Sequence, residues 1–178
     1  IWPAQLAGLG TKFDVVFNGQ EGKPLNLPYD VPSNEFMNLE GQKISGSRNW
    51  AVWVNEFLEN YDPDPLRYYL TVNMPESKDT DWDWEDFFKR NNDELVATWG
   101  NLCNRVISFA NKHWGEVPEP GELEDMDKEL LATIEKGFDT VAKEYEAVHL
   151  RAALGETMRL ATEVNKYLDV AAPWQLVK

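Results

Sequence analysis

The sequence predicts a mainly α-helical protein, in which a bundle of long helices follows a shorter segment of strand-like pieces. Three patterns of apolar residues at spacings of three and four run through residues 95–168. Each is typical of a helix that buries one stripe of its surface. Residues 1–60 differ, because short apolar runs alternate there with Gly, Pro and Asn. Hydrophobic residues make up 43% of the 178 positions, which indicates a folded chain and not a disordered one.

The N-terminal segment contains two strand-like runs, at residues 13–17 and 35–39. Turn signals separate them at Asn18-Gly19, at residues 22–24 and at Glu40-Gly41. Such clusters of Gly, Pro and Asn usually mark turns between strands. Two runs cannot build a doubly wound sheet alone, so we expect them to be the tail of a Rossmann-type domain.

Helical spacing begins near residue 50 and continues in two short stretches. The first predicted helix carries Trp50, Trp53, Val54, Phe57 and Tyr61. The two prolines within residues 62–65 end it, because proline cannot continue the ladder of helical hydrogen bonds. We predict a second short helix over residues 66–72 and a polar connection over residues 75–83.

Three longer helices are predicted after residue 85, each from one apolar face. The first face comprises Leu95, Trp99, Leu102, Val106, Phe109 and His113. The second comprises Leu130, Ile134, Phe138, Val141, Tyr145 and Val148, and the third Leu150, Leu154, Met158, Ala161, Val164 and Leu168. Each stripe is too narrow for a helix buried on all sides, so the helices are expected to pack together as a bundle.

Charge and cysteine content limit the possible functions. Seventeen Lys and Arg oppose 31 Asp and Glu, and the net charge of −14 argues against general affinity for a polyanion unless basic residues gather on one face. The single thiol, Cys103, favours a reducing, cytoplasmic setting. We predict no metal site, because His149 has no Cys or His nearby. We also predict no membrane span, which needs roughly 20 apolar residues.

Residues 40–49 form a loop of small residues directly before a predicted helix. Backbone amides and hydroxyls of such a loop can bind polyphosphate, and Lys43 can neutralise charge that develops on a leaving group. The alternative is an ordinary turn with a helix cap. The residues concerned are Lys43, Ile44, Ser45, Gly46 and Ser47.

Two polar patterns in the bundle also allow two interpretations each. A polar stripe with successive spacings of four, three and four residues comprises Asn101, Arg105, Ser108 and Lys112. This stripe is either a solvated helix face or a surface that contacts phosphates and base edges. Residues 165–174 end in Pro173-Trp174, where the ring either folds back onto the core or stacks on a base.

The loop and these two runs, in this order, resemble the methionyl-tRNA synthetases, which are class I aminoacyl-tRNA synthetases. The loop is similar to the Lys-Met-Ser-Lys-Ser signature and follows Leu39-Glu40-Gly41 as in the methionine enzymes. Ile44 replaces the methionine and Gly46 the second lysine. The resemblance implies that Lys43 binds ATP phosphates, whereas Asn101, Arg105 and Trp174 contact the anticodon.

The resemblance covers nearly the whole chain and implies a function. The intact enzyme would activate methionine with ATP and Mg²⁺ and transfer it to methionine tRNA, whose anticodon is CAU. Residues 1–48 would be the end of the catalytic domain, and residues 85–178 would form the anticodon-binding bundle. Residues 49–84 would be a helical segment that connects these two parts. The chain alone is expected to be inactive. An acidic helical module that binds proteins but no nucleic acid is the alternative, favoured by the net charge of −14.

Overall fold

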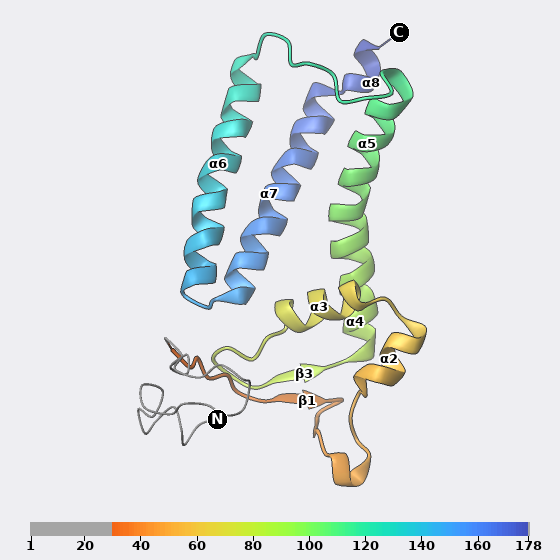
Figure 1. The fold of residues 1–178 in the computed structure, drawn as a ribbon, viewed down its shortest axis with the longest axis vertical. Coiled ribbons are helices and arrows are strands. Elements are labelled where there is room, and N and C mark those ends of the chain that lie inside the picture. The colour runs from red at the N-terminus through yellow and green to blue at the C-terminus, as the bar shows by residue number, and fades with distance from the viewer. Residues whose placement is uncertain (1–29, 178) are drawn as a thin grey trace, which may run out of the picture. The chain divides into compact units, whose positions relative to one another are not determined.

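The computed structural model describes residues 30–177. The predicted strand at residues 13–17 and the turn signals at residues 18–24 lie outside this range. From Asn34 onward the chain forms one compact unit, which contains a small sheet and a set of helices (Figure 1).

A three-stranded sheet in the order β2-β1-β3 supports the loop. β1 (Met37–Leu39) pairs antiparallel with β2 (Gln42–Lys43) and parallel with β3 (Thr80–Trp82). Glu40 and Gly41 both have positive φ, at 49° and 72°, as the tightest hairpin turn requires. The predicted strand at residues 35–39 and its turn are therefore confirmed.

The predicted polar connection over residues 75–83 is wrong at its end, because β3 occupies Thr80–Trp82. Three residues are too few to show a strand period. Pairing with β1 makes this segment a strand, with Met37 opposite Thr80 and Leu39 opposite Trp82.

The two short helices are confirmed with changed boundaries. The first, α2, covers Val54–Asn60. Contrary to the prediction, Trp50 lies outside this helix, and Trp53 and Tyr61 only cap its two ends. Trp50 instead forms a β-bridge with Ser45. The second, α3, covers Pro63–Val72, because Pro63 begins a helix as readily as it ends one.

An aromatic core joins the sheet to the helices. The buried residues of this cluster are Leu39, Phe57, Leu66, Tyr69, Trp82 and Phe87. The rings of Trp82 and Phe87 stack with their centroids 5.2 Å apart, and Tyr69 meets Trp82 edge-on at 4.9 Å. These are the offset and edge-to-face arrangements that aromatic pairs prefer.

A continuous helical stretch leads from this core into the bundle. It consists of α4 (Trp84–Arg90), the π-helical segment η3 (Asn91–Gly100) and α5 (Asn101–His113). Within η3 the hydrogen bonds reach one residue further back than in an α-helix; the Asn101 amide, for example, donates to the carbonyl of Val96. The wider turns change which residues share a face.

The apolar face predicted for this helix is therefore only partly correct. Leu102 is buried, but Trp99, Val106 and His113 are exposed. The prediction assumed regular α-helical spacing from residue 95 to residue 113, which η3 interrupts.

Two helices of equal length complete the bundle. α6 (Asp125–Glu146) and α7 (Leu150–Ala171) pack against each other, and α7 also contacts α3, η3 and α5 (Figure 1). Gly137 is the buried residue of α6, whereas Phe138, Tyr145 and Val148 of the predicted face are exposed. The predicted helices thus exist, but the face assigned to α6 is wrong at Phe138 and Tyr145, and Val148 lies beyond the end of α6. The short helix α8 (Pro173–Leu176) ends the described chain.

No helix between residues 30 and 177 combines the length and the apolar character needed to cross a bilayer. Over the same range, no three His, Cys, Asp or Glu side chains form a group suited to a metal ion.

Candidate phosphate-binding loop and nucleic-acid interface

The loop predicted to bind phosphates is a closed turn held by backbone bonds. The Ser45 amide donates to the Trp50 carbonyl at 2.8 Å, and the Trp50 amide donates to the Ser45 carbonyl at 2.9 Å. The intervening residues Gly46–Arg48 form one 3₁₀ turn, and Asn49 closes it with φ of 51°. The two ends of this turn are therefore bonded to each other, and residues 46–49 between them are exposed.

The chemical groups of the loop lie close together. The Ser45 and Ser47 hydroxyls are 3.2 Å apart, and a guanidinium nitrogen of Arg48 donates to the Lys43 carbonyl at 2.9 Å. The Lys43 ammonium is 5.8 Å from the centroid of the Phe36 ring. Within residues 30–177, neither Lys43 nor Arg48 is within salt-bridge distance of a carboxylate. Both positive charges are thus available to an anion.

Ile44 and Gly46 contribute to the loop in different ways. Ile44 lines an apolar cavity of about 130 Å³ together with Leu66 and Trp82, so it anchors the loop on the core. A Cβ added at Gly46 would lie 3.7 Å from Trp53, which is an ordinary contact. The turn therefore does not require glycine at this position on steric grounds.

Acidic side chains from the sheet hold the base of the loop, and sequence reasoning missed them. Both carboxylate oxygens of Asp81 accept from the Gly41 amide, each at 2.9 Å. Glu40 accepts from the Trp84 amide at 3.1 Å, at the first residue of α4. These hydrogen bonds fix the turn at Glu40-Gly41 to β3 and to the start of α4. Lys43, two residues after this turn, is therefore held at a defined position relative to α4. The sequence signal was weak, because Asp81 lies in a segment that carried no strand pattern.

The second candidate site brings together two of the three residues predicted to contact the anticodon. The Arg105 guanidinium lies over the Trp174 ring, 5.0 Å from its centroid. This is within the range of an attractive cation–π contact. Trp174 keeps 44% of its surface exposed, because Ala172 turns the chain with φ of 42° and Pro173 begins α8 there.

Two residues of α7 orient Arg105, and neither was predicted to belong to the site. Asp169 accepts from Arg105 Nη2 at 2.7 Å, and the Asn165 side-chain oxygen accepts from Nη1 at 3.3 Å. Asn165 also donates to the Thr98 carbonyl of η3 at 3.2 Å. Asn165 and Asp169 are one helical turn apart and therefore lie on the same side of α7. This spacing is the feature of the sequence from which their shared role could have been predicted.

Asn101 and Lys112 lie on the same helix as Arg105 but are not drawn into this cluster. Asn101 begins α5 one turn before Arg105, and Lys112 lies near the end of α5. Both side chains are exposed, and among the described residues no hydrogen bond links either of them to Arg105 or Trp174. The basic stripe predicted from Asn101 to Lys112 is therefore joined to Trp174 through Arg105.

The Arg105 cluster combines an exposed ring with a charge that is largely balanced. Asp169 is two-thirds exposed, whereas only 26% of the Arg105 side chain is accessible. Such a surface attracts a polyanion weakly, but it offers a π face and guanidinium donors at a defined position. This suits a single unstacked base better than a regular duplex.

Comparison with known proteins identifies the family to which the chain is similar. Residues 1–107 match the family described as tRNA synthetases class I (M), and residues 117–178 match the anticodon binding domain of methionyl tRNA ligase. Methionine–tRNA ligases of Roseiflexus castenholzii and Roseiflexus sp. strain RS-1 are 51% and 52% identical over 178 residues. These alignments cover 100% of this chain and 28% of each relative.

Solved structures show the same likeness. Mycobacterium tuberculosis methionyl-tRNA synthetase in complex with methionyl-adenylate superposes with a TM-score of 0.77 and 31% identity, over 85% of this chain and 30% of that one. The apo form of that enzyme gives a TM-score of 0.75 and 28% identity over 98% of this chain and 31% of that one. The chain spans less than a third of the length of these relatives.

Proposed function

The chain belongs to the methionyl class I tRNA synthetases, and from this premise we propose that it is part of a methionine–tRNA ligase. In this proposal the chain contributes the loop that closes over ATP and the surface that reads the anticodon of methionine tRNA. The stacking of Arg105 on exposed Trp174 is the observation that carries it. The alternative of an acidic protein-binding module is not favoured by the family match.

We assign anticodon reading to Asn101, Arg105 and Trp174. The exposed part of the indole offers a surface on which one unstacked base of CAU can stack. Base–aromatic stacking contributes about 1–3 kcal/mol. The free donors of the Arg105 guanidinium and the amide of Asn101, one turn earlier on α5, can then bond base edges.

We assign ATP binding to the loop from Lys43 to Ser47, with Arg48 as an additional cation. When the carboxylate of methionine attacks the α-phosphorus of ATP, the bond to pyrophosphate breaks and negative charge grows on the departing group. Lys43 would neutralise that charge, while Ser45 and Ser47 donate hydroxyl hydrogen bonds. Mg²⁺ would arrive bound to the ATP phosphates.

The activity of the intact ligase remains part of the proposal, since the chain spans less than a third of its relatives. We expect the 178-residue chain to show no ATP–pyrophosphate exchange by itself. The division into residues 1–48, 49–84 and 85–178 is proposed in the same way. A cytoplasmic location is also proposed, which suits the single thiol of Cys103.

The decisive experiment is binding of a labelled anticodon stem-loop, followed by fluorescence anisotropy. A stem-loop with CAU is compared with one whose first anticodon base is changed. Trp174→Ala is compared with Trp114→Ala, a control tryptophan that is 48% exposed and packs on Phe109. We expect CAU to bind more tightly, and only Trp174→Ala to remove the difference.

Equal binding of both stem-loops by a folded protein would overturn the anticodon assignment. Equal losses in Trp174→Ala and Trp114→Ala would overturn the specific role of Trp174. A thermal melt of each variant establishes that the bundle is folded, so that a loss of binding is attributable to the removed ring.

A further inference from the structure

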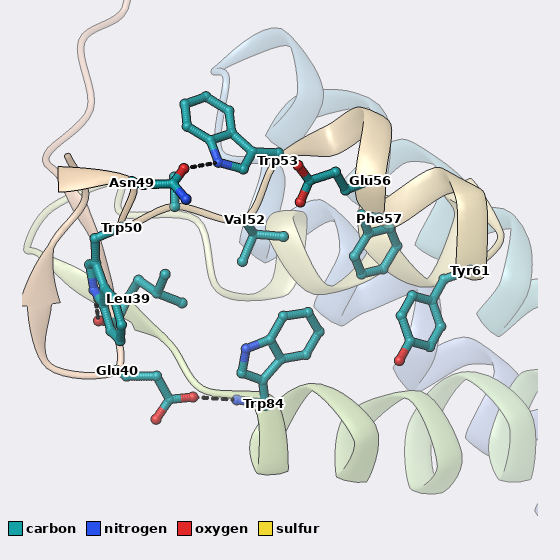
Figure 2. A pocket seen from close by; sticks show the side chains of 11 residues that line it. Leu39, Glu40, Asn49, Trp50, Val52, Trp53, Glu56, Phe57, Tyr61 and Trp84 are labelled. Atoms are coloured by element: carbon teal, nitrogen blue, oxygen red, sulfur yellow. Dashed lines mark hydrogen bonds between the residues drawn. The ribbon is translucent and has the colours of Figure 1, made fainter. Parts of the chain in front are cut away.

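A cavity of about 360 Å³ lies directly behind the loop and has no role in the function proposed above. Figure 2 shows side chains from the end of β1, from residues 49–53, from α2 and from the start of α4 around it. Its volume lies within the range of pockets that hold small molecules, about 300–1,000 Å³. Leu39, Ala51 and Val52 form the aliphatic part of its wall.

The lining is aromatic and acidic. Its five rings belong to Trp50, Trp53, Phe57, Tyr61 and Trp84, and its only ionisable groups besides the Tyr61 phenol are two carboxylates. No lysine, arginine or histidine lines it. Aromatic faces carry negative electrostatic potential and attract cations within about 6 Å of the ring centre. The rings and the carboxylates therefore both favour a positively charged ligand.

Two indole N–H donors of the lining are already used. The Trp50 indole N–H donates to the Leu39 carbonyl at 3.0 Å, and that of Trp53 donates to the Asn49 side-chain oxygen at 3.0 Å. These two N–H groups are thus not available to an anion or a carbonyl group.

The acceptors, by contrast, have capacity to spare. One oxygen of Glu40 accepts from the Trp84 amide, which leaves the second oxygen. The Glu56 carboxylate has no hydrogen-bond or salt-bridge partner within residues 30–177. We propose that this cavity binds a small organic cation, in which an alkylated ammonium or guanidinium group lies among the rings and faces Glu40 and Glu56.

Binding there would act on the loop through shared residues. Trp50 closes the loop by its bridge to Ser45, and Asn49 ends the 3₁₀ turn. A bound cation therefore contacts the segment that sets how the loop closes. The cavity nevertheless stands apart from the tRNA and ATP assignments, because its lining includes none of the residues named for them.

The test uses the 178-residue chain without RNA or phosphate. Choline is titrated while NMR follows the indole N–H signals of Trp50, Trp53 and Trp84. Its neutral isostere, in which a tert-butyl group replaces the trimethylammonium group, is titrated in parallel. Agmatine serves as the guanidinium probe. We expect saturable shifts with at least one cation, and affinity about tenfold above that of the isostere.

Charge-removing variants test the two carboxylates. Glu56→Gln keeps the side-chain length, and Glu40→Gln keeps an acceptor for the Trp84 amide, so both should fold. Each is expected to weaken the better cation about three- to tenfold. The matched control is Glu59→Gln, which changes another exposed glutamate of α2 that does not line the cavity.

Three results would overturn the proposal. Equal affinity for choline and its isostere would show an apolar cavity without charge selectivity. Equal behaviour of Glu56→Gln and Glu59→Gln would show that the carboxylate is not involved. Absence of saturable shifts with both cations, in a chain whose thermal melt is cooperative, would show that the cavity binds neither class.

Discussion

The guanidinium of Arg105 lies 5.0 Å from the centroid of the Trp174 ring, while its Nη2 donates to Asp169 at 2.7 Å. Three helices, α5, α7 and α8, supply these residues. Arg105 is therefore oriented before any RNA arrives, and its charge is largely balanced. Under the proposed function, an acidic chain with a net charge of −14 would in this way select one RNA loop by stacking and hydrogen bonds, with little general attraction for polyanions.

Asp169→Asn should loosen this selection. Without the carboxylate, the Arg105 charge becomes available to any phosphate, so binding to all stem-loops should strengthen about two- to fivefold. The preference for CAU should fall, because the guanidinium is no longer held over Trp174. Stem-loop anisotropy at low and high salt measures both effects. Asp139→Asn on the exposed side of α6 removes the same charge elsewhere, and matching results from both variants would contradict the prediction.

Gly46→Lys should strengthen anion binding by the loop without disturbing it. A Cβ there makes only an ordinary contact with Trp53, at 3.7 Å. Affinity for inorganic tripolyphosphate, measured by calorimetry, should rise about two- to fivefold, and Arg48→Ala should lower it by a similar factor. Gly121→Lys is the control, because its Cβ would meet no atom within 4 Å and it lies outside the loop. An equal gain from Gly121→Lys would indicate a general charge effect.

Most helices, the turn at Glu40-Gly41 and the strand within residues 35–39 could be predicted from the sequence. Their signals are local: prolines between short helices, turn residues, and apolar spacing over many turns. The resemblance to a family pointed to Arg105 and Trp174 as anticodon contacts, whereas their contact with each other is seen only in the structure. Spacing alone favoured an ordinary solvated face for Arg105.

The features that escaped prediction depend on distant contacts. β3 exists because Thr80–Trp82 pairs with β1, and nothing within its three residues indicates a strand. The π-helical segment η3 changes which residues share a face within it and after it, so Trp99 in η3 and Val106 in α5 are exposed. In the candidate sites, Asp81 and Asp169 act on residues from other elements, and their roles depend on how those elements meet.

Gly137→Ala should destabilise the bundle, because α6 and α7 approach closely at this glycine. An added Cβ would lie 2.5 Å, 2.6 Å and 3.0 Å from three side-chain carbons of Leu160. Overpacking of this kind costs about 1–3 kcal/mol of the free energy of unfolding. Gly155→Ala on α7 is the matched control, since its Cβ would meet nothing within 4 Å.

The control should gain about 0.5–1 kcal/mol from the better helix propensity of alanine. Urea unfolding followed by circular dichroism measures both variants. Equal free energies of unfolding for the two would show that Leu160 moves aside without cost, and that the close approach of α6 and α7 does not depend on glycine.

Alkaline pH should destabilise the contact between α3 and the long helix. Burial, together with the hydrogen bond to Glu94 at 2.6 Å, raises the pKa of Tyr68. Burial raises the pKa of Tyr69 to about 12, with the Asp86 carboxylate adding to the effect. An unfolded tyrosine has a pKa of about 10. Both pKa values are thus higher in the folded state than in the unfolded state.

A group of this kind contributes stability that is fully present below pH about 10 and is lost as the pH rises through its folded pKa. The free energy of unfolding should therefore decline from pH about 10 upward, and Tyr68→Phe, which removes one titrating group, should make the decline shallower. Urea unfolding at a series of pH values measures the slope. Tyr145→Phe, which replaces a phenol that is 53% exposed, is the matched control. Identical slopes for Tyr68→Phe and Tyr145→Phe would show that the buried phenol does not control alkaline unfolding.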